Sequence, residues 1–135
     1  MVLRLAIHRD FLPLRLQEES VAELAQSVSD KALPDSAEIS AYLKSGPELF
    51  SAMGARRDIL TGAELILGAD SIRTDGDWLW REDLHYYFSR YHVRLPEEFI
   101  ALIRERRYEV PQLSAEQLRE LSEERRAILS GSKPA

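Results

Sequence analysis

The dipeptide Asp75-Gly76 constrains the fold of this chain more than any other part of its sequence. It lies between short apolar runs, where Asp-Gly favours a two-residue hairpin loop because a type I′ turn needs positive φ at both central residues. With these residues as the loop, Ile72 faces Leu79 and Arg73 faces Trp78. A guanidinium opposite an indole favours a cation–π contact. Strand alternation then gives one face of the hairpin three large side chains: Arg73, Trp78 and Trp80.

Helices explain most of the remaining pattern. Apolar side chains recur at i, i+3, i+4 and i+7, most regularly at Leu84, Tyr87, Phe88 and Tyr91. Capping residues, prolines and glycines indicate where the helices begin and end. We expect helices near residues 20–28, 35–46, 49–53, 82–91, 96–107 and 114–129, and a strand near residues 2–7.

These elements predict an α+β fold, mostly helical, with five to six helices and a small antiparallel β element that includes the hairpin around Asp75-Gly76. The length of 135 residues predicts one domain, residues 1–131, followed by a flexible tail at residues 132–135. No apolar run approaches the length of a membrane span, and the N-terminus lacks the features of a signal peptide. We expect a cytoplasmic protein, which the absence of cysteine fits, although a chain without cysteine is also tolerated in an oxidising compartment.

The net charge of −5 is concentrated in one segment. Residues 58–83 hold seven acids against two arginines, whereas the flanking segments are nearly neutral. An acidic segment repels phosphate backbones and attracts basic partners, so we expect no nucleic-acid partner. A solvated acidic surface without any partner explains the same pattern.

No motif indicates a metal, a cofactor or a catalytic residue. The aspartates around Gly76 do not fit the ligand spacing of an EF-hand, and turn geometry explains them without calcium. His85 and His92 are seven residues apart, which is not the spacing of a zinc-binding helix. Serine-hydrolase, P-loop and dinucleotide-binding motifs are absent from the sequence.

The run TDGDWLWREDLHYYFSRYHVRLPEEF, residues 74–99, resembles a group of small bacterial proteins. That group has the pattern TDG-x-W-x-W, a short spacer, an aromatic L-x-YY helix and LP-x-x-F. The preceding EISAYLKSG and Asp58 are also similar, whereas residues 1–35 and 112–135 lie outside the resemblance. Small acidic proteins of this type resemble immunity proteins encoded beside secreted toxins, which implies a toxin as the partner.

The leading hypothesis is a non-enzymatic protein that binds a partner, such as a toxin, through an acidic and aromatic face. Aromatic side chains are enriched at interface hot spots, and acids direct the approach of basic partners. The alternative is an enzyme or small-ligand-binding protein whose site assembles from Asp58, Asp75, Asp77, His85 and Tyr86. Core packing competes as an explanation for the aromatic residues, of which Tyr86 is expected to be the most exposed. The candidate partner-binding residues are Asp70, Arg73, Asp75, Asp77, Trp78, Trp80, Glu82, Asp83 and Tyr86.

Overall fold

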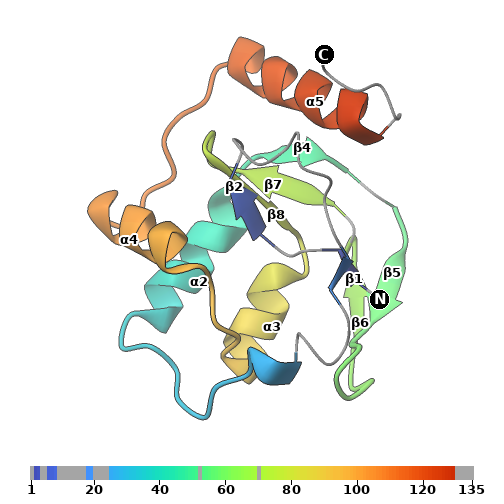
Figure 1. Ribbon diagram of the computed structural model, residues 1–135, viewed down its shortest axis with the longest axis vertical. Coiled ribbons are helices and arrows are strands. Elements are labelled where there is room, and N and C mark those ends of the chain that lie inside the picture. The colour runs from blue at the N-terminus through green and yellow to red at the C-terminus, as the bar shows by residue number, and fades with distance from the viewer. Residues whose placement is uncertain are drawn as a thin grey trace.

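The predicted hairpin lies at the centre of a four-stranded antiparallel sheet, seen in the computed structural model in Figure 1. Its strands are β7 (Ile72–Thr74) and β8 (Trp78–Arg81), flanked by β4 (Glu48–Phe50) and β2 (Ala6–His8) in the order β2-β8-β7-β4. Two smaller antiparallel pairs join β1 (Val2–Leu3) to β3 (Glu18–Glu19), and β5 (Ala55–Arg57) to β6 (Leu65–Leu67). The structure describes residues 2–3, 6–8, 18–19, 25–51, 53–69 and 71–129.

Four helices with defined bounds lie in the described part of the chain: α2 (Ser36–Ser45), α3 (Leu84–Tyr91), α4 (Glu97–Glu105) and α5 (Ala115–Leu129). Helices α2, α3 and α4 lie together, and α5 lies beside β4 (Figure 1). None of the described helices is both long enough and apolar enough to cross a membrane. The α+β class is therefore confirmed, with fewer helices than the five to six predicted.

The prediction of a helix near residues 49–53 is wrong. Residues 48–50 form the edge strand β4, in which Glu48 pairs with Arg73 and Phe50 with Ile72. Pairing with the hairpin overrides the weak local helical pattern, as tertiary contacts commonly do. The predicted helix at 20–28 begins outside the described residues, although residues 25–26 are helical. The predicted tail at residues 132–135 also lies outside them.

The predicted register of the hairpin is wrong by two residues. Thr74 faces Leu79 and Arg73 faces Trp80, so that residues 75–77 connect β7 to β8, which begins at Trp78. Gly76 has a φ of +99°, whereas Asp75 is not among the residues of positive φ, and the turn is not type I′. Because a shift of two preserves strand alternation, the predicted grouping of side chains on each face still holds.

The core forms where the tryptophan face of the hairpin meets the helices. Trp78 stacks on Phe99 of α4 with ring centroids 4.7 Å apart, and Trp80 lies 5.4 Å from the same ring. Tyr42 of α2 contacts both Trp80 and Phe99. The Trp80 indole N–H donates to the carbonyl of Leu43 at 2.9 Å, which satisfies its polar atom within the core.

Candidate functional site

The carboxylate of Asp75 determines the shape of the hairpin loop. Its Oδ1 accepts the backbone N–H groups of Asp77 and Trp78 at 2.9 and 2.7 Å, an Asx-type turn. Its Oδ2 accepts the hydroxyl of Tyr42 at 2.6 Å and lies 3.1 Å from the guanidinium of Arg106. Burial and the bond to Asp75 raise the pKa of Tyr42 above its usual range. Since Asp75 is 1 % exposed, this carboxylate is an internal structural group.

The other predicted partner-binding residues separate into buried and accessible ones. Trp78, Trp80 and Asp83 are buried, the last in a two-point ion pair with Arg81 at 3.0 and 3.1 Å. The predicted stacking of Arg73 on Trp78 gives way to an ion pair between Arg73 and Glu82 at 2.7 Å. The residues that retain partial exposure are Arg73, Asp77, Glu82 and Tyr86, while Asp70 lies outside the described residues.

Arginines from beyond residue 83 neutralise part of the acidic excess of residues 58–83. Asp77 and Asp75 both contact Arg106, and Glu64 lies 3.9 Å from Arg90. These two arginines belong to the chain beyond residue 83, so a count along the sequence separates them from the acids that they neutralise. The described part of the acidic segment is therefore a set of ion pairs and hydrogen bonds, which weakens its long-range attraction for a basic partner.

A second carboxylate, Asp58, is surrounded by hydroxyl groups. Tyr86 donates to its Oδ2 at 2.6 Å, Tyr91 donates to the same oxygen, and the N–H of Leu60 donates to Oδ1 at 2.7 Å. Burial raises the pKa of the Asp58 carboxyl, but these bonds outweigh it and hold that pKa at about 2. Tyr87 adds a further link, because its hydroxyl accepts the N–H of Ile59 at 3.1 Å.

We call Asp58, Tyr86, Tyr87 and Tyr91 the tyrosine cluster. It joins the loop between β5 and β6 to helix α3. Its hydroxyl groups donate to a carboxylate or bind backbone, and burial raises the pKa of both Tyr86 and Tyr87. Such phenols stay protonated near neutral pH, so the cluster is suited to holding two elements together rather than to removing protons.

The residues of the predicted dispersed site form two clusters rather than one. Asp58 and Tyr86 meet in the tyrosine cluster, and Asp75 and Asp77 meet at Arg106. His85 belongs to neither cluster: it lies 3.9 Å from Glu82, and burial lowers its pKa. Within the described residues, no group of three or more His, Asp or Glu side chains is placed to hold a metal ion.

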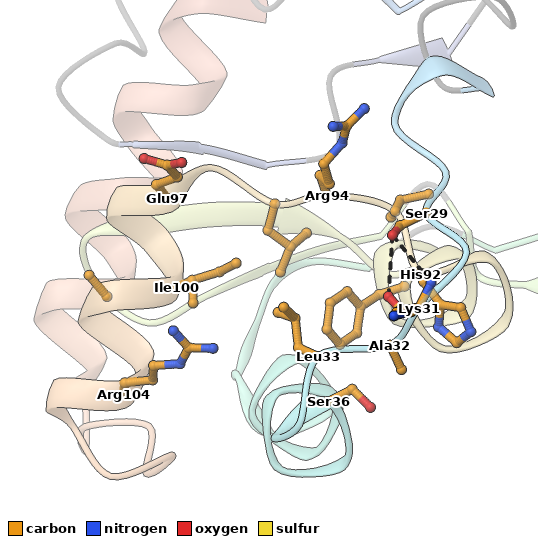
Figure 2. Close-up of a pocket in the computed structure, with 14 residues that line it drawn as sticks. Ser29, Lys31, Ala32, Leu33, Ser36, His92, Arg94, Glu97, Ile100 and Arg104 are labelled. Atoms are coloured by element: carbon orange, nitrogen blue, oxygen red, sulfur yellow. Dashed lines mark hydrogen bonds between the residues drawn. The ribbon is translucent and has the colours of Figure 1, made fainter.

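A cavity of about 440 Å³ lies elsewhere, between the segment that precedes α2, the turn after α3 and one side of α4. Figure 2 shows Ile100 and Arg104 projecting from α4 toward Leu33, with Arg94 and Glu97 at another edge. None of the site residues predicted from the sequence, for partner binding or for the dispersed site, lines this cavity. Three separate segments of the chain form its walls. The spacing of residues in the sequence does not show that these segments come together.

An exposed apolar face is the second feature that sequence patterns missed. The pairing of β5 with β6 places Leu67 opposite Ala55 and Leu65 opposite Arg57 on one side of this hairpin, while Ile66 is buried on the other. Leu65 is 55 % exposed, Leu67 77 % and the preceding Met53 100 %. We define the outer hairpin face as Ala55, Arg57, Leu65 and Leu67.

Comparison with known proteins adds no relative: no family model, no curated protein and no solved structure matches this chain. The candidate sites therefore rest on the geometry of this structure. They are the outer hairpin face and the cavity beside α4.

Proposed function

We propose that this protein is a binding module that contacts another protein through the outer hairpin face. The observation that carries the proposal is the exposure of Leu65 and Leu67 on one face of the β5–β6 hairpin, with the exposed Met53 two residues before β5. Large apolar side chains gathered on one exposed surface are typical of protein-interaction sites, because covering them releases their hydration water. A single arginine, Arg57, lies among them, a residue type that is also enriched at interfaces.

The partially exposed residues of the predicted acidic and aromatic face supply a smaller, secondary surface in this proposal. Asp77 has 44 % of its side chain exposed and contacts Arg106. Glu82 is 17 % exposed and bound to Arg73. Paired acids of this kind contribute orientation and discrimination between partners more than binding energy.

As the more specific form of the proposal, the partner is a bacterial toxin, and the chain is a non-enzymatic immunity protein acting in the cytoplasm. Support comes from the small size of 135 residues, from the net charge of −5, and from an exposed apolar surface. Neutralisation by binding needs such a surface and no catalytic group.

The test is affinity purification of the tagged chain from its own bacterium, comparing wild type with the Leu65→Ser/Leu67→Ser variant. Val28→Ser is the matched control, since Val28 is also apolar and exposed but does not belong to the hairpin. We expect one protein to be recovered in stoichiometric amounts by wild type and by the control, and to be lost from the hairpin variant. Identification of that protein as the product of the adjacent gene, with toxicity relieved by the chain, supports the immunity form.

The hairpin variant is expected to fold, because surface substitutions usually change stability by about 0.5 kcal/mol or less. Circular dichroism and thermal unfolding check this. Equal recovery of the partner by the hairpin variant would show that the contact lies elsewhere. Recovery of no protein by wild type overturns the proposed function.

A further inference from the structure

We propose that the cavity beside α4 binds a small organic monoanion that has an apolar body and a single carboxylate. This site is separate from the outer hairpin face, and the inference does not depend on the proposed function. Nothing in the sequence pattern pointed to it, because its lining residues are spread from Ser29 to Arg104.

The walls of the cavity suit an apolar body. Leu33, Phe88, Val93, Leu95 and Ile100 line it, and Phe88, Val93 and Leu95 are themselves buried. The volume of about 440 Å³ lies within the range of about 300–1,000 Å³ that is usual for small-molecule sites. Apolar walls with a few polar groups at the edge are also the usual composition of such sites.

The charges around the cavity are opposite in sign to those of the whole chain. Three cationic side chains, Lys31, Arg94 and Arg104, line it against one acid, Glu97, although the chain has a net charge of −5. Arg104 is neutralised by Asp35 at 2.8 and 3.0 Å. Counting these five groups leaves one positive charge, which matches a monoanion better than a dianion.

Two of the cations are available for a ligand. Within the described part of the chain, neither Lys31 nor Arg94 forms an ion pair with a carboxylate. Arg94 is held in place by donating to the carbonyl of Gln26 at 2.7 Å, which leaves the rest of its guanidinium free to donate. Charge-assisted bonds from such groups are the strong contacts that orient a carboxylate, while the apolar walls hold its body.

Octanoate is a suitable probe, and 1-octanol is its neutral counterpart of the same chain length. We expect saturable binding of octanoate by isothermal titration calorimetry, with chemical-shift changes confined to residues 29–36 and 88–104. Octanol should bind at least tenfold more weakly, because it lacks the charge that Lys31 and Arg94 recognise.

The variant Lys31→Gln/Arg94→Gln should also weaken octanoate binding at least tenfold, equivalent to about 1.4 kcal/mol. Lys44→Gln is the matched control, since Lys44 is an exposed cation of α2 that does not line the cavity. It should bind octanoate as the wild type does. A second variant, Ala101→Phe, places a ring in the cavity and should abolish binding without changing its charge.

The proposal is overturned by any of three results: no saturable binding of octanoate, equal binding of octanol, or unchanged binding in the double variant. Unfolding curves for each variant separate loss of the site from loss of the fold. The measurement needs no protein partner, so its failure leaves the role of the outer hairpin face untouched.

Discussion

Replacement of Asp75 by alanine tests whether this carboxylate holds the hairpin to the helices. The substitution removes the acceptor for two loop N–H groups at 2.9 and 2.7 Å and for the Tyr42 hydroxyl at 2.6 Å. It also leaves the half-buried Arg106 without its buried counter-charge. Removing one partner of a buried ion pair costs about 3–5 kcal/mol, and each buried polar group left unsatisfied is worth about 1–3 kcal/mol. We expect Asp75→Ala to lose about 4 kcal/mol of unfolding free energy.

Asp77→Ala is the matched control, because Asp77 is two residues away, carries the same side chain and contacts the same arginine. Its side chain is 44 % exposed, and exposed ion pairs contribute only about 0–1 kcal/mol. Urea denaturation followed by the fluorescence of Trp78 and Trp80 measures both, since both indoles are buried. With a slope of about 2 kcal/mol per molar urea, Asp75→Ala should lower the midpoint by about 2 M.

Equal midpoints for Asp75→Ala and Asp77→Ala would refute this reasoning, because the burial of Asp75 and its bonds to the loop would then add no stability. If Asp75→Ala does not fold at all, Asp75→Asn provides the measurement. Asparagine keeps an oxygen for the loop N–H groups and loses the charge that faces Arg106. Its midpoint should fall below those of wild type and of Asp77→Ala, because the buried charge that faces Arg106 is lost.

Three further outcomes follow from the geometry. The pKa of Asp58 is lowered from 3.8 to about 2, so its ionised carboxylate stabilises the fold by about 2 kcal/mol above about pH 4, and this stabilisation is lost as the pH falls toward 2. In urea titrations at several pH values, Asp58→Asn should flatten this dependence of stability on pH. An unchanged pH profile in the variant contradicts the assignment. Gly46→Ala places a Cβ 2.7 Å from the ring of Trp80 and should lower stability by about 1–3 kcal/mol in thermal unfolding, whereas an unchanged Tm would mean that the ring moves freely. Gly76→Ala combines a φ of +99° with a Cβ 3.0 Å from Leu113, and should lose about 1–2 kcal/mol by the same measurement; no loss would show that the loop relaxes at no cost.

Local patterns predicted the helices better than the hairpin register. The apolar stripe of α3 and the glycine after α2 identified both elements closely, since these signals act within a few residues. Asp75-Gly76 identified the hairpin but not its loop length. The length depends on a carboxylate bonded at once to the loop, to Tyr42 and to Arg106, and the last two are 33 and 31 residues away.

The candidate functional surfaces were less predictable for the same reason. Tryptophans and acids in the hairpin resembled an interface in the sequence, yet Phe99 and Arg106 from later in the chain cover or neutralise them. Whether Leu65 and Leu67 are exposed depends on how the rest of the chain packs around their hairpin. Neither hydropathy nor spacing carries that information, because it is a property of the assembled fold.

The tyrosine cluster has a consequence for how the outer hairpin face is presented. Asp58 and Tyr86 fix one end of the loop between β5 and β6 to α3, and Asp58 also donates its backbone N–H to the carbonyl of Glu64 at 2.9 Å. Because these bonds fix the loop, the β5–β6 hairpin that carries the outer hairpin face is ordered in the free protein. A flexible loop loses conformational entropy when it binds a partner, whereas this hairpin has already lost that entropy during folding. In the proposed binding role, we expect the outer hairpin face to dock without rearrangement of its backbone. The tyrosine cluster should then show the same hydrogen-exchange protection with and without a partner.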